Sequence, residues 1–359
     1  MIRRTFLAGA VAALASPALG RGADPGLGGL LIAGFEGART SDPGVVSAAE
    51  SIARGDIAGV IIMRSNVRSR DALHAIIKLF RSAARDAAPI ISIDQEGGKV
   101  ARLGPENGFM RWAAARDVVT GGDEGWVRSY YAKRAVELSD VGINLNYGPV
   151  LDLDVNPSNP IIGALGRSYG AGPAAVSSAA GAFVMAHRAA RVATCVKHFP
   201  GHGSATTDSH DGVTDVGESW SAAEMEPFRD LTGAGLTDSV MIGHLTHPEF
   251  SDGPGIPATL SRRAVMAVRE RTGFDGPIIS DDMGMGAITD GFGEGSAALM
   301  AANAGLTFLI RSDGVRGNRR GGAARALKAL RDGYASGALD AATAEGSIET
   351  ARRFRASLA

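Results

Sequence analysis

The chain has 359 residues, of which 45% are hydrophobic and 21% charged, and its formal net charge is −1. This length allows a sizeable buried core, and the balanced charge gives no general attraction to nucleic acid or to an anionic membrane surface. The composition therefore predicts a globular protein that binds no nucleic acid and does not insert stably in a membrane.

Residues 1–23 are typical of an export signal. Arg3 and Arg4 form a twin-arginine start, an Ala-rich apolar run covers 8–19, and small residues around Ala18 offer a cleavage site. The run is shorter than the ~20 apolar residues that span a bilayer. We expect a periplasmic protein, with a cytoplasmic location as the alternative. The single cysteine, Cys195, cannot form an internal disulfide, which fits folding in a reducing compartment before export.

Short apolar runs then recur along the rest of the chain, and most are separated by stretches with helical periodicity. The predicted strands are 30–33, 60–63, 90–93, 144–147, 194–196, 240–242, 278–280 and 307–310. The predicted helices include 72–84, 127–138, 174–189 and 262–270. Near-continuous apolar strands that alternate with helices indicate a parallel sheet covered on both faces, and eight of them suggest closure into a barrel. We predict one (β/α)8 domain over residues 24–359.

A doubly wound open sheet is the alternative fold. It is disfavoured because the first strand is followed by Gly34-Phe35-Glu36-Gly37, which lacks the glycine spacing of a dinucleotide-binding turn. No cofactor is expected.

The densest group of polar side chains lies in Lys197-His198-Phe199-Pro200-Gly201-His202-Gly203, which continues to Asp208 and His210. Proline and glycines exclude a helix directly after the strand, so these groups belong to a loop at the strand's carboxyl end, where α/β enzymes usually place their chemistry. Asp208 is two residues from His210, close enough to orient an imidazole that serves as acid and base near neutral pH. A loop of ordinary, hydrogen-bonded histidines is the alternative.

Other predicted strands are also followed by polar residues. These are Asp94 to Arg102, Asp152 with Arg167, His244 with His247, and Asp281 with Asp282. Capping of a helix explains a single aspartate in such a place, but it does not explain polar groups after five strands. We expect them to gather at one rim of the barrel.

These residues resemble family 3 glycoside hydrolases, and in particular the single-domain β-N-acetylglucosaminidases of peptidoglycan recycling. The matching motifs are KHFPGHG with Asp208-Ser209-His210, DQEGG at 94–98, SDDM at 280–283 and PATLS at 257–261. The resemblance implies a (β/α)8 barrel and a retaining hydrolase. It assigns the nucleophile to Asp281 and the acid/base pair to His210 and Asp208. An ionised carboxylate can attack the anomeric carbon, while an imidazolium beside a carboxylate is stabilised and can protonate the leaving oxygen.

The same resemblance implies how the sugar is held. Its recognition is assigned to Asp94, Arg102, Arg167, Lys197, His198 and Met283. Met283 and Met285 are equally compatible with a core position. Asp152 is expected to brace loops, and Asp282 to brace or cap. The expected substrate is a small saccharide that contains N-acetylglucosamine, handled by a monomer without a metal.

The chain also departs from the family's usual pattern at three places. Gly166 stands where an aspartate usually precedes the arginine, Lys99 replaces an arginine, and Leu306-Thr307 replaces a small residue followed by aspartate. These changes affect expectations about fine specificity and leave the predicted catalytic set complete.

Three other functions remain as alternatives. A metal-dependent hydrolase would use His198, His202, Asp208, His210 and Asp281 as ligands. A sugar-binding protein would bind without turnover. A β-glucosidase-like specificity is the nearest alternative within the enzyme class.

Overall fold

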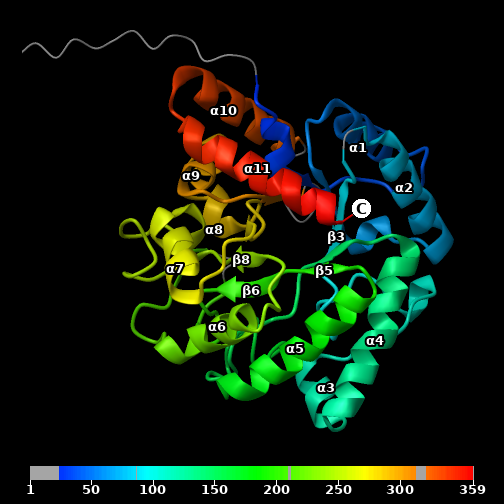
Figure 1. Cartoon of the computed structure of the whole chain (residues 1–359), viewed down its shortest axis with the longest axis vertical. Helices are drawn as coiled ribbons and strands as arrows, with labels where there is room; N and C mark the ends of the chain where they lie inside the picture. The colour runs from blue at the N-terminus through cyan, green and yellow to red at the C-terminus, as the bar shows by residue number, and fades with distance from the viewer. Residues whose placement is uncertain (1–23, 86, 209–211, 313–320, 359) are drawn as a thin grey trace, which may run out of the picture.

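The computed structural model describes residues 24–85, 87–208, 212–312 and 321–358. The predicted export signal at 1–23 and the predicted acid/base His210 lie outside these residues. Figure 1 shows the strands at the centre and the helices around them. No helix of the described ranges is long and apolar enough to cross a membrane.

The strands of the barrel are short, buried and parallel. They are β1 (Leu31–Ala33), β2 (Gly59–Ile62), β3 (Ile90–Ile93), β4 (Leu145–Asn146), β5 (Ala193–Thr194), β6 (Val196–Phe199), β8 (Val240–Ile242), β10 (Ile278–Ser280) and β11 (Leu309–Arg311). One sheet has the order β11-β1-β2-β3-β4-β5, and a second has the order β10-β8-β6. Every pair within these two sheets is parallel. A third, small sheet pairs β7 (Thr214–Asp215) with β9 (Leu245–Thr246).

All eight predicted strand positions are occupied, and the fifth is split into β5 and β6. The split occurs at Cys195, whose N–H faces the carbonyls of Asn146 and Gly148, each at 3.0 Å. The chain then changes partner, because Val196 N donates to Ser239 O at 3.0 Å. An isolated parallel bridge between Ile279 and Phe308 links the two sheets at the other junction. The prediction of a (β/α)8 arrangement is confirmed, with ladders interrupted at these two junctions.

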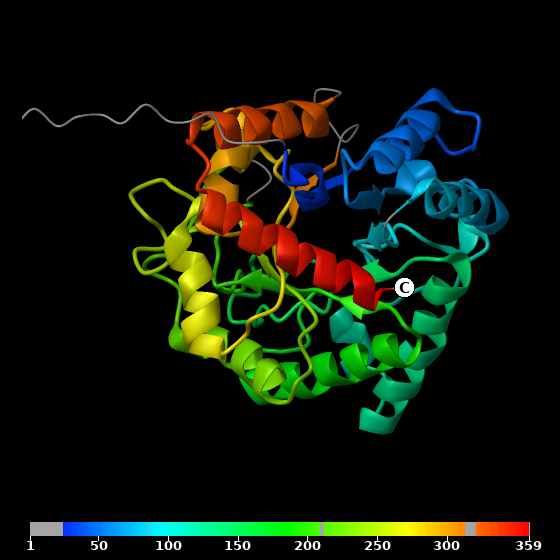
Figure 2. The same ribbon diagram turned by 45° about the horizontal axis from the view of Figure 1, so that its top comes forward.

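The helices surround the strands, as the turned view in Figure 2 shows. They are α1 (Pro43–Arg54), α2 (Arg70–Ala83), α3 (Ala115–Thr120), α4 (Glu124–Val141), α5 (Pro173–Ala189), α6 (Glu226–Gly233), α7 (Arg262–Thr272), α8 (Gly286–Thr289), α9 (Glu294–Ala304), α10 (Gly322–Ser336) and α11 (Ala341–Ser357). The four predicted helices fall within α2, α4, α5 and α7, apart from Ala84, which follows the end of α2. The short 3-10 turns are η1 (Leu27–Leu30), η2 (Arg64–Asn66), η3 (Pro105–Asn107), η4 (Ala222–Met225) and η5 (Ala258–Leu260).

Helix α2 illustrates why the sequence folds in this way. The Ser69 side chain caps its amino end by accepting a hydrogen bond from Ala72 N at 3.2 Å. Its buried residues recur at helical spacing, and they are Leu73, Ile76, Ile77 and Phe80. Burial of each such side chain contributes about 1.5–3 kcal/mol, so this face fixes the helix against the strands.

Helix α11 covers the amino end of the barrel. The Arg355 side chain donates to the carbonyls of Ala87 and Ala88, which precede β3. The Phe354 ring packs against Phe308, which precedes β11, with 5.9 Å between ring centroids. The predicted polar rim therefore lies at the opposite, carboxyl end of the strands.

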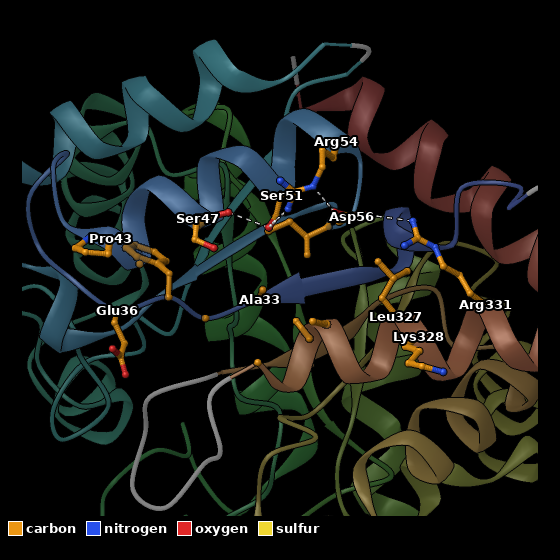
Figure 3. A pocket seen from close by; sticks show the side chains of 18 of the residues that line it. Ala33, Glu36, Pro43, Ser47, Ser51, Arg54, Asp56, Leu327, Lys328 and Arg331 are labelled. Carbon is orange, nitrogen blue, oxygen red and sulfur yellow. Dashed lines mark hydrogen bonds and ion pairs between the residues drawn. The ribbon is translucent and has the colours of Figure 1, made fainter.

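A cavity of about 660 Å³ lies between β1, α1 and α10. Figure 3 shows Arg54, Asp56 and Arg331 near one end of it. Asp56 is paired there with Arg54 at 2.7 Å and with Arg331 at 3.1 Å. None of the predicted site residues lines this cavity, so the cavity is separate from the polar rim.

Candidate active site

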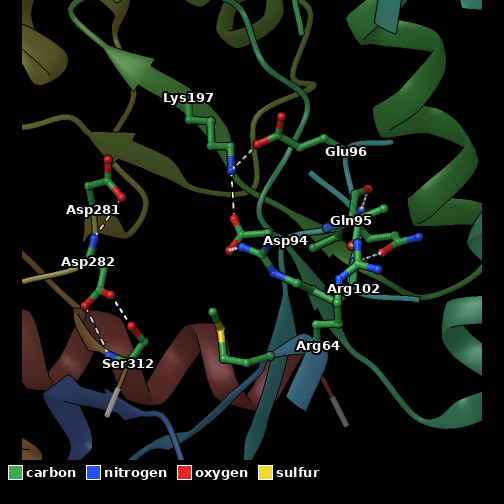
Figure 4. A network of polar contacts seen from close by, with 12 residues as sticks. Arg64, Asp94, Gln95, Glu96, Arg102, Lys197, Asp281, Asp282 and Ser312 are labelled. Carbon is green, nitrogen blue, oxygen red and sulfur yellow. Dashed lines mark hydrogen bonds and ion pairs between the residues drawn. The ribbon is translucent and has the colours of Figure 1, made fainter. Parts of the chain in front are cut away.

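Lys197 on β6 connects two acids of the loop that follows β3. Its Nζ lies 2.8 Å from Asp94 Oδ1 and 2.7 Å from Glu96 Oε1 (Figure 4). Arg102 reaches the other oxygen of Asp94 at 3.0 Å. Burial opposes ionisation of Asp94, yet Lys197 and Arg102 outweigh it and lower the pKa of this carboxyl. Asp94 is thus held as an anion whose oxygens can accept hydrogen bonds from sugar hydroxyls.

Glu96 and Arg167 extend this network below the rim. Two nitrogens of Arg167 each lie 2.8 Å from a different oxygen of Glu96, which is a bidentate pair between two buried side chains. Although burial favours its neutral form, Arg167 and Lys197 lower the pKa of Glu96 to about 2. Glu96 was not among the residues predicted to bind the sugar. Its place in DQEGG, two residues after Asp94, is the signal that could have identified it.

Arg167 is braced although Gly166 stands where the resemblance led us to expect an aspartate. Besides the Glu96 pair, Arg167 NH1 donates to Ile161 O at 3.0 Å. Gly166 itself has φ +64, a conformation that favours glycine. The departure at Gly166 therefore does not leave Arg167 without support.

His198 is oriented by Asp152. The Nδ1 atom of His198 lies 2.6 Å from Asp152 Oδ2, and Asp152 Oδ1 accepts the backbone N–H groups of His198 and His202 at 3.2 and 2.8 Å. Asp152 is fully buried. Burial opposes its ionisation, but the nearby His198 lowers the pKa of Asp152 to about 2. This geometry is that of the expected loop brace, and it directs His198 Nε2 toward Arg167, 3.4 Å away.

The glycines of KHFPGHG are required by close packing. A Cβ on Gly201, which has φ +126, would meet the Cβ of Glu224 at 2.6 Å, and a Cβ on Gly203 would lie 1.9 Å from Leu153 O. The Gly203 N–H donates to Glu224 Oε2 at 3.0 Å. Burial, reinforced by Asp152, raises the pKa of Glu224 to about 7. Glu224 thus supports the start of the loop that leads to Asp208.

The two aspartates after β10 have different environments. Asp281 is half-buried, its N–H donates to Ile242 O at 3.0 Å, and its Oδ1 accepts the N–H of Asp282 at 2.8 Å. The Asp282 carboxylate accepts the N–H groups of Gly284 and Ser312 at 2.9 and 3.1 Å and also the Ser312 hydroxyl. These contacts tie Asp282 to the backbone of the turn and to Ser312, as expected of a residue that braces the turn.

Met283 belongs to the hydrophobic core cluster and is 6% exposed, so its side chain packs with the barrel interior at this edge. Lys99 is exposed, which places that departure at the surface of the loop.

The structure joins Asp94, Arg102, Arg167, Lys197 and His198 into one polar network. Figure 4 shows Asp281 and Asp282 on the side of this network opposite Arg102. Asp208 is half-buried farther along the loop after β6, and its predicted partner His210 is outside the described residues. Among the residues that are described, no three His, Cys, Asp or Glu side chains form a group that could hold a metal ion.

Comparison with known proteins shows to which family this chain belongs. The model of the glycosyl hydrolase family 3 N-terminal domain matches residues 44–343. The chain belongs to glycoside hydrolase family 3. The identification made from KHFPGHG, DQEGG and SDDM is therefore confirmed.

Individual members of family 3 show the same relationship. The β-hexosaminidase of Tolumonas auensis is 36% identical over 78% of this chain and 81% of its own length. The β-hexosaminidase LpqI of Mycobacterium tuberculosis is 37% identical over 61% of this chain and 57% of its own. A solved family 3 β-N-acetylglucosaminidase from Paenibacillus has a TM-score of 0.83 and 31% identity, over 93% of this chain and 62% of that one. The chain spans about half the length of several curated relatives that it matches.

Proposed function

We propose that this family 3 protein is a retaining exo-acting β-N-acetylhexosaminidase that releases terminal β-linked N-acetylglucosamine from peptidoglycan-derived fragments. The observation that carries the proposal is the position of Asp281 across the carboxyl end of the barrel from the network of Asp94, Lys197, Glu96 and Arg167. The names of the relatives, β-hexosaminidase and β-N-acetylglucosaminidase, support the same activity.

In the proposed first step, a carboxylate oxygen of Asp281 attacks the anomeric carbon. The glycosidic bond breaks, and its oxygen takes a proton from His210, so the aglycone leaves as an alcohol and a glycosyl-enzyme remains. In the second step, His210 removes a proton from water, which attacks the same carbon and releases Asp281. Asp208 orients the imidazole in both steps.

The network around Asp94 holds the sugar during both steps. Asp94 is fixed as an anion by Lys197 and Arg102 and accepts hydrogen bonds from sugar hydroxyls. Arg167 is a further donor at the same place, and His198, which is held by Asp152, contacts it at 3.4 Å. Because these groups are already paired and buried, little reorganisation is needed when the sugar binds.

A paired-substrate assay tests this function. The protein is offered an aryl β-N-acetylglucosaminide and the matching aryl β-glucoside, with and without a chelator. We expect turnover of the first substrate, with the anomeric configuration retained by NMR and no effect of the chelator. Preference for the glucoside would favour the β-glucosidase alternative, loss with the chelator would favour the metal-dependent one, and binding without turnover would indicate a sugar-binding protein.

We also propose that the protein is exported as a folded monomer by the twin-arginine route, because Arg3-Arg4 precede a short apolar run. Replacement of both arginines by lysine should retain the full-length precursor in the cytoplasm with unchanged specific activity. A native chain that fractionates with the cytoplasm at full length would contradict this proposal. Light scattering of the purified protein tests whether it is a monomer.

A further inference from the structure

Two features of the chain have no part in the proposed steps. His244 lies two residues after the end of β8, and Thr259 lies on η5 within the motif PATLS. Both side chains are completely buried at 0% exposure. Their positions bring them together although they are 15 residues apart in the sequence.

His244 contacts the turn that carries Asp281. Its Nε2 lies 2.9 Å from the backbone carbonyl oxygen of Asp282, and its Nδ1 lies 2.8 Å from Thr259 Oγ1. The Thr259 hydroxyl also lies 2.7 Å from Gly243 O and 3.2 Å from Ile242 O. The imidazole therefore lies between the β8 segment and the β10 turn.

The proton positions follow from what each atom can donate. A carbonyl oxygen only accepts, so His244 Nε2 must carry a proton toward Asp282 O. The Thr259 hydroxyl has one proton. It donates either to His244 Nδ1 or to Gly243 O, and in the second case Nδ1 must carry a proton of its own to donate to Thr259 Oγ1. Both arrangements keep the Nε2–H bond to Asp282 O, and Thr259 fixes the ring plane in each.

The hydrogen bond from His244 Nε2 to Asp282 O adds to the backbone contacts that restrain the turn after β10. Asp281 N donates to Ile242 O, and Met283 N donates to Ile310 O at 2.9 Å. His244 holds the carbonyl between them, on Asp282. The Asp282 carbonyl and the Met283 N–H share one peptide plane, so these two hydrogen bonds hold that plane from both sides. The Asp282 N–H belongs to the preceding peptide plane and donates to Asp281 Oδ1, 2.8 Å away.

We propose that His244, supported by Thr259, is a positioning residue that sets the orientation of the Asp281 carboxylate through the backbone of Asp282. This inference rests on the proposed role of Asp281 as nucleophile. It gives PATLS a function, because the threonine of the motif orients the histidine. His244 does not touch the sugar, so its loss should slow the chemical steps and leave binding unchanged.

Two near-isosteric substitutions separate the two contacts. In His244→Gln the amide nitrogen can occupy the place of Nε2 and keep the bond to Asp282 O. In His244→Asn the amide reaches only the place of Nδ1, so the contact with Thr259 is kept and the bond to Asp282 O is lost. A misplacement of about 1 Å can cost about 10²-fold in rate. We expect kcat on the aryl N-acetylglucosaminide to fall about 10²-fold in His244→Asn and about 10-fold or less in His244→Gln.

Thr259 provides a rescue pair in the same assay. Thr259→Val should lower kcat about 10-fold because the ring loses its support, and Thr259→Ser, which keeps the hydroxyl, should recover most of that loss. In all four variants, KM and the inhibition constant for free N-acetylglucosamine should stay within about 2-fold of wild type, since no sugar contact is removed.

His247 serves as the matched control. It is a buried histidine three residues farther along the same segment, and its Nδ1 accepts the N–H of Glu249 at 3.1 Å. His247→Asn keeps that acceptor and should leave kcat unchanged, and melting curves of all variants report any general loss of stability.

The possible outcomes separate the inference from the proposed function. Wild-type turnover of the aryl substrate tests the function itself, and an inactive wild type would overturn both proposals. With an active wild type, equal rates for His244→Asn and His244→Gln, or a loss that falls on KM and inhibitor binding, would overturn the positioning role alone.

Discussion

The two sides of the barrel's carboxyl end hold their acids by different means. On the side of β3 and β6, Asp94 and Glu96 are paired with Lys197, Arg102 and Arg167. On the side of β10, backbone N–H groups and a serine hydroxyl donate to the Asp282 carboxylate.

The difference reflects two tasks. Cations fix the charge of an acid, and they lower the pKa of Asp94 and Glu96 against the effect of burial. Neutral donors fix the position of Asp282, the neighbour of the proposed nucleophile, without adding a positive charge there. On this account the first side binds the sugar and the second presents the nucleophile. Substitutions on the β10 side should therefore affect turnover most, and substitutions in the ion-paired network should affect stability and binding.

The largest effect is expected at Asp281. Asp281→Asn should lower kcat more than about 10⁴-fold because the amide cannot form the glycosyl bond. Asp282→Asn should be milder, since it weakens a brace. Both are measured on the aryl N-acetylglucosaminide, with circular dichroism as a check of folding. A greater loss in Asp282→Asn would mean that the adjacent aspartate is the nucleophile.

The loop after β6 should show a dependence on the leaving group. An aryl group departs with little protonation, whereas a second sugar needs the proton that we assign to His210, worth about 10²–10⁴-fold. His210→Ala should therefore lose far more activity on a disaccharide than on an aryl substrate, and Asp208→Asn should show the same pattern more weakly. Equal losses on both substrates would place the general acid elsewhere.

Glu96→Gln tests the ion-paired side. It removes one partner of a buried bidentate pair and leaves Arg167 partly uncompensated, which should lower the free energy of unfolding by about 3–5 kcal/mol and raise KM. Urea denaturation at neutral pH measures the first effect. Lys328→Ala is the control, because the Lys328–Asp332 pair is exposed and should contribute less than about 0.5 kcal/mol. Equal stabilities of the two variants would contradict a structural role for the buried pair.

The smallest expected effect is the dependence of folding stability on pH that comes from Glu224. The pKa of Glu224 in the folded state is raised from 4.5 to about 7. The stability that protonated Glu224 contributes is therefore fully present below pH 4.5 and is lost as the pH rises through about 7. Glu224→Gln cannot ionise and still accepts the Gly203 N–H. Its stability relative to wild type should therefore rise by up to about 3 kcal/mol between pH 5 and pH 8. A constant difference across this range, measured by chemical denaturation, would show that Glu224 does not titrate there.

The sequence predicted the strands and helices, and the polar residues that follow the strands, because both are local patterns. The run Ile90–Ile93 is a strand as expected, and Asp94 follows it at the rim. The division of the fifth strand at Cys195 was missed, since it depends on which neighbouring strand offers the next carbonyl. The pairing of Glu96 with Arg167, 71 residues away, and of His244 with Asp282, 38 residues away, could not be read from spacing. Such contacts arise only when the barrel brings separate strand ends together.

The most direct test of the central claim is to locate the covalent intermediate. His210→Ala is mixed with the aryl N-acetylglucosaminide and quenched with acid, and its peptides are analysed by mass spectrometry. We predict an N-acetylglucosaminyl ester on Asp281, accumulating because the second step has lost its base. An ester on another residue, or steady turnover with retained configuration and no ester on Asp281, would contradict the assignment of the nucleophile to the β10 side.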